Sequence, residues 1–131
     1  ETEILEFAEV NFQTVKESDS VEKAISLMSS TNQSELIVLD ANEEFKGKIN
    51  SLSLFNKSGT LLEAAVIDTN SIVIKHNASL QIAMEIAADF VGEIIPIVNT
   101  DTKKAVAVIT EGAIFQAYLS KQNQTVDVEK R

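Results

Sequence analysis

The sequence predicts a mixed α/β (α+β) fold of two β-α-β-β-α repeats, packed around a pseudo-two-fold axis and sharing one core. Two observations predict it. Sliding the chain by 59 residues, or by 60 after one added loop residue, superimposes three segments of the first half on three of the second: 14–28 on 73–87, 36–40 on 95–99, and 47–55 on 107–115. The order of apolar and polar positions is also the same in both halves. Agreement over four successive elements indicates a duplication.

Each repeat is predicted to begin with a short β-branched strand, Thr14–Val15 in the first and Ile72–Ile74 in the second. An amphipathic helix follows, because apolar residues recur at helical spacing. They are Val21, Ala24, Ile25 and Met28 in the first repeat, and Leu80, Ala83, Met84, Ala87 and Ala88 in the second. Asp19 with Glu22 could form a capping box before the first helix, and Ser79 is the expected N-cap of the second.

Two buried strands and a closing helix are predicted to complete each repeat. The strands are Leu36–Leu39 and Lys46–Ile49, then Ile94–Val98 and Ala105–Ile109; the helices are Leu52–Phe55 and Ala113–Leu119. The segment 56–60 suits a turn, because it is polar and contains Gly59. We therefore expect a first repeat with its lead-in at 1–58, a second repeat at 59–120, and a disordered polar tail at 121–131.

Composition limits the function. The 131 residues have a net charge of −9, so the basic face that nucleic acid requires is not expected. No apolar run approaches the roughly 18 residues of a membrane span, so direct insertion into a bilayer is not expected either. The chain has no cysteine, which excludes disulfides, thiolate metal sites and cysteine nucleophiles. Because it starts at Glu1, it is expected to be part of a larger protein.

No set of residues indicates catalysis. The sequence contains no Ser-His-Asp order, P-loop or GxGxxG motif, and His76, its only histidine, lies in a polar stretch, KHNAS. Asp101 falls in a predicted hairpin loop, where a turn role is favoured over metal binding. We expect a protein that is not an enzyme, with no catalytic residue and no metal site.

The repeated order of six segments resembles a tandem pair of CBS domains, or Bateman module, over residues 8–120. The segments are DSVEKAISLM and ASLQIAMEIA, SELIVLD and GEIIPIVN, and GKINSLSLF and AVITEGAIF. The resemblance implies a regulatory module that forms homodimers through its helices, either head-to-head or head-to-tail. Many members bind adenosine nucleotides between the repeats, and the module is attached to enzymes, transporters and channels.

The second half, with Tyr118 near the end of its final helix, is similar to the cytoplasmic C-terminal part of ClC-type chloride channels and transporters. This implies a cytoplasmic module tethered to an inner- or plasma-membrane protein, with the membrane domain of that protein as its partner. The alternative is a module that senses AMP or ATP and is attached to a soluble enzyme or another transporter.

The resemblance also implies where a nucleotide would bind. In nucleotide-binding members, the turn after the closing strand reads Thr or Ser, two residues, then Asp; the hydroxyl reaches phosphate and the carboxylate accepts from both ribose hydroxyls. Here Thr110 keeps the hydroxyl, whereas Ala113 lacks the carboxylate. The first repeat departs further, with Asn50 and Ser53 at the same places.

The remaining cleft residues implied by the resemblance are mixed in character. Ile72, Gly92 and Pro96 could form an apolar slot for adenine, whereas the charge of Glu93 would oppose a phosphate. The second repeat is therefore the only candidate nucleotide cleft, with Lys103 and Lys104 as nearby cations. We expect it to be degenerate, in a module that acts through dimer contacts.

Overall fold

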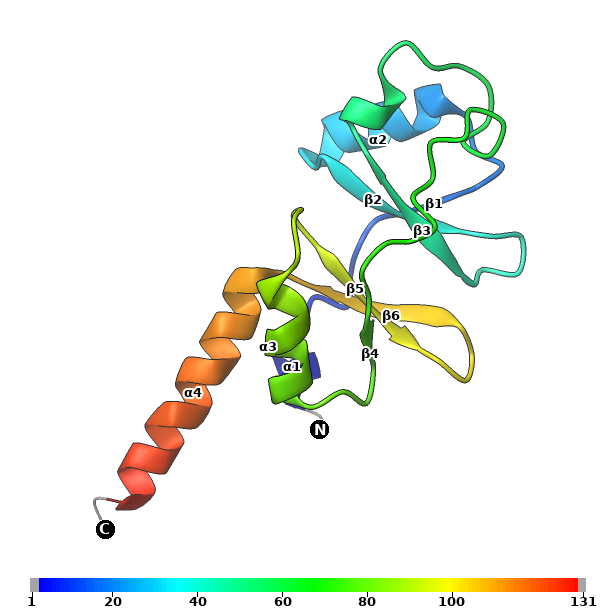
Figure 1. Cartoon of the computed structure of the whole chain (residues 1–131). Coiled ribbons are helices and arrows are strands. Elements are labelled where there is room, and N and C mark those ends of the chain that lie inside the picture. Colours follow the sequence, from blue (N-terminus) through cyan, green and yellow to red (C-terminus); the bar gives the residue numbers. More distant parts are fainter. Residues whose placement is uncertain (1–2, 130–131) are drawn as a thin grey trace. The chain divides into compact units, whose positions relative to one another are not determined.

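The computed structural model describes the backbone of residues 3–129 and the side chains of residues 4–123. A short helix, α1 (Glu3–Glu6), precedes two copies of one element order (Figure 1). The first copy contains β1 (Thr14–Lys16), α2 (Val21–Thr31), β2 (Glu35–Leu39), β3 (Phe45–Asn50) and the 3-10 turn η1 (Leu52–Leu54). The second contains β4 (Ile74–Lys75), α3 (Leu80–Ala88), β5 (Ile95–Asn99), β6 (Lys104–Ile109) and α4 (Glu111–Glu129). The predicted α+β class is confirmed.

Each repeat forms its own three-stranded sheet, in the orders β1-β2-β3 and β4-β5-β6. The first two strands of each sheet run parallel, because a helix connects them, and β3 runs antiparallel to β2. Leu36, Ile37 and Val38 of the central strand β2 are all fully buried, which explains why this strand reads as a continuous apolar run rather than an alternating one.

Serine residues begin the two main helices. The Ser20 hydroxyl accepts from the Lys23 N–H at 3.0 Å, and the Ser79 hydroxyl accepts from the Ile82 N–H at 3.2 Å. The prediction that Ser79 caps its helix is confirmed. The predicted capping box of Asp19 and Glu22 is wrong, because Ser20 is the N-cap of α2. The Asp19 carboxylate instead accepts from the Lys16 N–H at 2.8 Å and from the Lys23 ammonium at 3.2 Å.

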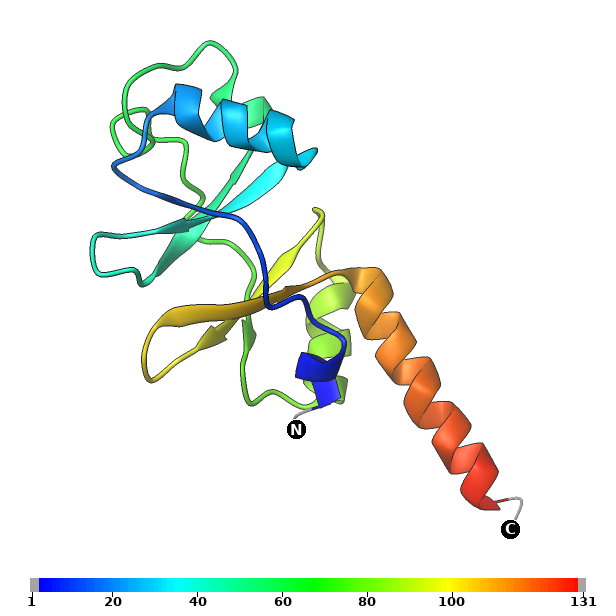
Figure 2. The same cartoon turned by 180° about the vertical axis from the view of Figure 1, so that it is seen from behind.

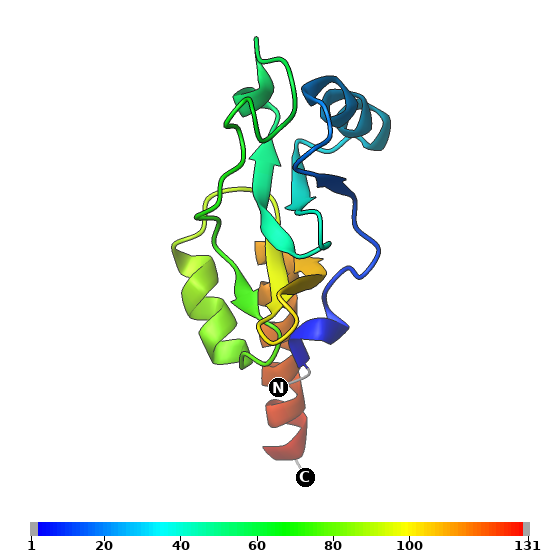
Figure 3. The same cartoon turned by 90° about the vertical axis from the view of Figure 1, so that its right-hand side faces the viewer.

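The closing helices of the two repeats differ from each other and from their predicted extents. In the first repeat only the turn η1 forms, because Phe55 is extended and Asn56 has a φ of 59°, which no right-handed helix accommodates. In the second repeat α4 continues to Glu129 and extends beyond α3 of the same unit (Figures 1 and 3). Residues 121–129, expected as a disordered tail, are thus helical, since no glycine or proline interrupts them; residues 130 and 131 lie outside the described part.

The molecule divides into two compact units whose boundaries differ from the predicted 1–58 and 59–120. Unit 2 contains Phe12–Ser71 and Thr100–Ala105, and unit 1 contains the rest. The segment that leads into each repeat pairs with a strand of the other repeat. Glu9, before the first repeat, exchanges two backbone hydrogen bonds of 2.8 and 2.9 Å with Val108 of β6. Asp68, before the second repeat, bridges Lys48 of β3 in the same way.

The buried side chains follow this exchange. The sequence predicts one core shared by both repeats, whereas the structure has two clusters, one in each unit. Ile4 of α1 is buried in the cluster formed by the second repeat, where α1 lies against α3 and α4 (Figure 2). Leu61 and Val66, which follow the first repeat, complete the other cluster. Each unit is therefore closed by a segment that leads into the other repeat.

Candidate functional site

The predicted turn after β6 forms the N-terminus of α4. The Thr110 hydroxyl oxygen accepts from the Ala113 N–H at 3.1 Å, and the Thr110 carbonyl accepts from the Ile114 N–H at 3.1 Å. The hydroxyl is exposed and keeps its proton for a further acceptor. Ala113 is half-buried against the core of unit 1 and offers no polar atom beyond its backbone. The Thr110 hydroxyl can therefore donate a hydrogen bond to a ligand, but position 113 lacks the carboxylate that would accept from both ribose hydroxyls.

The other four predicted cleft residues all lie in unit 1 but differ in exposure. Pro96 is buried inside β5, and Ile72 is half-buried against the core just before β4. Gly92 and Glu93 are adjacent and exposed before β5, where Gly92 has a φ of 146° that favours glycine. Thr110 and Ala113 are joined by a hydrogen bond, whereas Ile72 precedes β4, Gly92 and Glu93 precede β5, and Pro96 lies within β5.

In the first repeat, a charge pair occupies positions that are apolar in the second. The Lys48 ammonium lies 2.9 Å from the Glu35 carboxylate, and their side chains are only 10% and 12% exposed. The same repeat offsets lead from Glu35 to Ile94 and from Lys48 to Val108. Sequence reasoning missed this pair; its signal was a glutamate at the start of one apolar strand, β2, and lysines on the neighbouring strand, β3. The equivalent turn is closed as well, since Asn50 accepts from both the N–H and the hydroxyl of Ser53.

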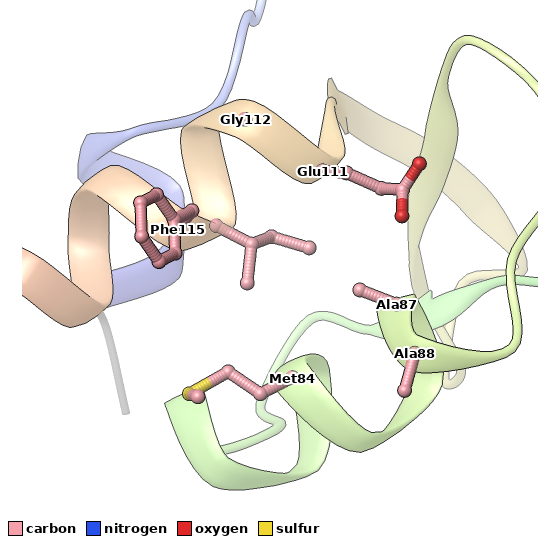
Figure 4. A pocket seen from close by; sticks show the side chains of 7 residues that line it. Met84, Ala87, Ala88, Glu111, Gly112 and Phe115 are labelled. Carbon is pink, nitrogen blue, oxygen red and sulfur yellow. The ribbon is translucent and has the colours of Figure 1, made fainter.

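A groove of about 460 Å³ lies between α3 and α4 in unit 1. Figure 4 shows Met84, Ala87 and Ala88 of α3 on one side and Glu111 and Phe115 of α4 on the other. Its lining is largely apolar, and the Phe115 side chain is 57% exposed. The sequence places Met84 and Phe115 on helical stripes, as core or dimer surface.

Unit 2 has an equivalent groove of about 400 Å³ between α2 and the segment around η1. Ile25 and Met28 line one side, and Leu54, Phe55 and Lys57 line the other. Four of these positions correspond to lining residues of unit 1 through the repeat offsets: Ile25 to Met84, Met28 to Ala87, Leu54 to Ile114, and Phe55 to Phe115. The two repeats thus present the same kind of surface, which is apolar and open to solvent.

Comparison with known proteins agrees with this architecture. Residues 6–57 match the family model described as the CBS domain. The cystathionine beta-synthase pair domain of a putative Mg²⁺ transporter from Shewanella oneidensis has a TM-score of 0.78 at 14% identity, covering 93% of this chain and 72% of that one. The chain has the fold of a tandem CBS domain pair.

Two further CBS pairs were solved with adenosine compounds. CBSX2, a CBS-pair protein of Arabidopsis thaliana, in complex with AMP has a TM-score of 0.72 at 20% identity, covering 88% of this chain and 93% of that one. The pair of protein MJ0100, in complex with 5′-methylthioadenosine and S-adenosyl-L-methionine, has a TM-score of 0.70 at 18% identity, covering 88% and 98%. No curated protein sequence matches the chain.

Other chemistry is sparse in the part of the chain that the structure describes. No group of three or more His, Asp or Glu side chains among residues 4–123 could hold a metal ion. His76 is the histidine that the sequence assigns to a polar turn. Its Nδ1 is buried without a hydrogen-bond partner, and its backbone N–H donates to the Val98 carbonyl. None of the described helices has both the length and the apolar character needed to cross a membrane.

Proposed function

We propose that this CBS pair is a non-catalytic regulatory module that dimerises and modulates a larger protein, and that this protein is a membrane transporter or channel. The observation that carries the proposal is the pair of equivalent, exposed apolar grooves, one on each unit. Contiguous apolar surface of this kind marks an interaction site in a soluble domain. A two-fold homodimer is the commonest way to cover such surfaces.

The choice of parent protein rests on similarity. The structural likeness to the pair domain of a putative Mg²⁺ transporter supports a membrane transport protein. Within that class we favour a ClC-type chloride channel, with the module in the cytoplasm, on the resemblance of residues 61–119 described above. Deleting the module from the complete parent protein should change its ion flux; unchanged flux at equal surface expression would contradict a modulating role.

Dimerisation can be tested on the chain itself. We expect sedimentation equilibrium to show a dimer that Phe115→Ser weakens by roughly tenfold or more, because an exposed aromatic anchor of an interface is removed. Val10→Ser is the matched control, since Val10 is 62% exposed but lines neither groove. A monomer at high micromolar concentration, or equal effects of the two variants, would overturn the proposal.

The second candidate function is adenosine-nucleotide sensing by the second repeat. The complexes of two similar CBS pairs with adenosine compounds favour it. Against tight binding, the turn lacks the ribose acceptor at Ala113, and leaving buried hydroxyls unpaired costs roughly 1–3 kcal/mol, or about tenfold to a hundredfold in affinity. The exposed carboxylate of Glu93 adds an unfavourable charge for a phosphate.

Calorimetry with AMP, ADP and ATP distinguishes the two candidates. We expect no low-micromolar affinity for any of the three nucleotides. Such an affinity would favour the sensing function, and its loss in Thr110→Val but not in Thr110→Ser would locate the nucleotide at the turn after β6. The serine variant keeps the hydroxyl, which both caps the helix and can donate, and lacks only the methyl group, so it separates loss of the hydroxyl from loss of the methyl group.

A further inference from the structure

The first lead-in segment, residues 3–9, is attached to unit 1 by a group of apolar side chains and one backbone bridge. Its helix α1 lies against α3 and α4 (Figure 2), and the Ile4 side chain, 2% exposed, is part of the core of unit 1. At the other end of the segment, Glu9 exchanges backbone hydrogen bonds of 2.8 and 2.9 Å with Val108 of β6. Three partly buried side chains between these two points pack against the same core: Leu5, Phe7 and Ala8. The segment thus binds unit 1 as a short peptide does, through apolar side chains and one strand pair.

The equivalent segment of unit 2, residues 59–68, is held by more contacts. It has two buried apolar side chains, Leu61 and Val66. In addition to the bridge at Asp68, the N–H groups of Leu61 and Leu62 donate to carbonyls of unit 2 at 2.9 and 3.0 Å. Among the described residues, the first lead-in segment has one buried side chain and a single backbone bridge to the rest of unit 1. A segment with fewer anchors opens at a lower free energy than the core that it covers, so the first lead-in segment is the more readily detached of the two.

Detachment of this segment leaves a site of peptide size on unit 1. The side chains that α3 and α4 bury in this core are aliphatic: Leu80, Ala83, Ala87, Ile114 and Ala117. The N–H and carbonyl of Val108 also lose their partners, which gives β6 an unpaired edge. An apolar surface beside an unpaired strand edge combines two features by which proteins bind peptides. The site under the segment therefore suits a peptide.

We propose that unit 1 has a peptide-binding site that the first lead-in segment occupies in cis, and that a segment of another protein with the same chemistry takes its place there. That chemistry is one helical turn with apolar residues at the first, second, fourth and fifth positions, as in ILEFA, followed by a residue that pairs with the edge of β6. Because it is covalently attached, the first lead-in segment competes at an effective concentration of about millimolar. A partner therefore binds only if its affinity exceeds that of the tethered segment or if the tethered segment is withdrawn. The site lies within one unit and does not depend on the proposed dimer.

A cleavable full chain tests the proposal, because all parts of the chain fold together before the cut. A protease recognition sequence is inserted between Val10 and Asn11, which are both exposed. After the cut, the first lead-in segment is free to exchange with a fluorescent synthetic peptide of residues 1–10, and fluorescence anisotropy measures binding. The matched control peptide carries Ile4→Ser, which removes the buried anchor. The uncut chain with the same insertion is the control protein.

We expect the cut chain to bind the natural peptide at least about tenfold more tightly than the uncut chain does, because the tethered competitor is gone. The Ile4→Ser peptide should bind the cut chain at least about tenfold more weakly, because it lacks the anchor. Equal binding of the two peptides, or equal binding to the cut and uncut chains, would overturn the proposal.

A cut chain that binds no peptide would also overturn it, whether circular dichroism shows that chain folded or unfolded, because the segment would then be a fixed part of the core. Sedimentation of the cut and uncut chains distinguishes a further occupant, the same segment of a second copy. If the cut converted a dimer to monomers, the segment would be exchanged between copies, which contradicts occupancy in cis.

Discussion

Lys48 and Glu35 form their 2.9 Å charge pair in the interior of unit 2, where the second repeat has Val108 and Ile94. Removing two charges from water is expensive, and their mutual attraction offsets that expense only while both are present. The pair therefore contributes little net stability compared with an apolar pair, but either charge alone would be strongly unfavourable. It also places charge where the second repeat offers an apolar surface.

We predict that Lys48→Val lowers the free energy of unfolding by about 3 kcal/mol, because it leaves the Glu35 carboxylate buried without its cation. The double variant Lys48→Val, Glu35→Ile, which reproduces the residues of the second repeat, should return to within about 1 kcal/mol of the natural chain. Urea unfolding followed by circular dichroism measures both. Equal stability of the single and double variants would show that the charges do not depend on each other.

The Asp19 carboxyl, just before α2 in unit 2, makes the stability of the fold depend on pH. Burial raises the pKa of its carboxyl, but the hydrogen bond from the Lys16 N–H and the charges of Lys23 and Lys16 outweigh burial, so the pKa is lowered. A lowered pKa in the folded state adds stability above the unfolded-state value of about 3.9, and this stability is lost as the pH falls through the folded-state value. The stabilisation is therefore present at neutral pH, and only its loss is confined to acidic solution.

For Asp19→Asn we predict a loss of about 1 kcal/mol at pH 7, typical of one hydrogen bond. The difference from the natural chain should shrink as the pH falls below about 4, because the natural carboxyl is then protonated and, like the asparagine amide, uncharged. Melting temperatures measured from pH 2 to pH 7 test this. A gap that stays constant over the whole range would exclude the charge of Asp19 as its cause.

At the scale of elements, Gly47 controls how β3 meets the segment at Asp68. A Cβ at position 47 would collide with the backbone carbonyl of Asp68, which cannot rotate away as a side chain can. The same carbonyl accepts from the Lys48 N–H at 3.3 Å, so the close approach accompanies the bridge between the two segments. Glycine is required here by proximity rather than by a positive φ.

We predict that Gly47→Ala destabilises the chain by about 1–3 kcal/mol, the usual range for forcing extra volume into a packed site. Gly112→Ala is the matched control, because its Cβ would make only an ordinary contact of 3.9 Å with the Thr110 hydroxyl oxygen, and alanine favours a helix over glycine by about 1 kcal/mol. It should therefore raise the melting temperature. If both variants changed stability in the same direction, the collision with Asp68 would not be the cause.

Element order could be predicted from the sequence because it depends on periodicity, and the repeat offset allowed each half to check the other. The extents of the closing helices could not be predicted. In the first repeat the positive φ of Asn56 stops the helix after η1, and in the second repeat no glycine or proline interrupts α4. The proximity of Thr110 and Ala113 was predictable because it is local. The pairing of Lys48 with Glu35, and of Glu9 with Val108, joins residues distant in sequence, and neither composition nor period encodes such contacts.

At the scale of the whole molecule, the exchanged lead-in segments make the units interdependent. Cutting after Ser58 would remove Leu61 and Val66 from the cluster of unit 2 and the Asp68 partner of β3. The hairpin Thr100–Ala105, whose Lys103 carbonyl accepts from the Phe45 N–H at 2.7 Å, would be lost as well. No single cut in the chain separates one complete unit from the other.

We therefore predict that a fragment ending at Ser58 does not fold, and that the full chain unfolds in one cooperative transition. Calorimetry should give equal calorimetric and van't Hoff enthalpies for the full chain. Circular dichroism of the fragment should show no thermal transition. Two resolved transitions of the full chain, or a fragment that melts cooperatively, would contradict this interdependence.

The exchange of lead-in segments bears on how such a chain could have arisen. A gene encoding one repeat would produce a polypeptide whose own lead-in segment is directed to another copy, so β3 or β6 would find its bridging residue only on a second molecule. Its folding would then depend on concentration, as in a strand-swapped homodimer. Duplication placed both reciprocal bridges, Glu9 to Val108 and Asp68 to Lys48, in one translation product. A bimolecular association thereby became an intramolecular closure, and each copy's sequence could diverge without losing its partner.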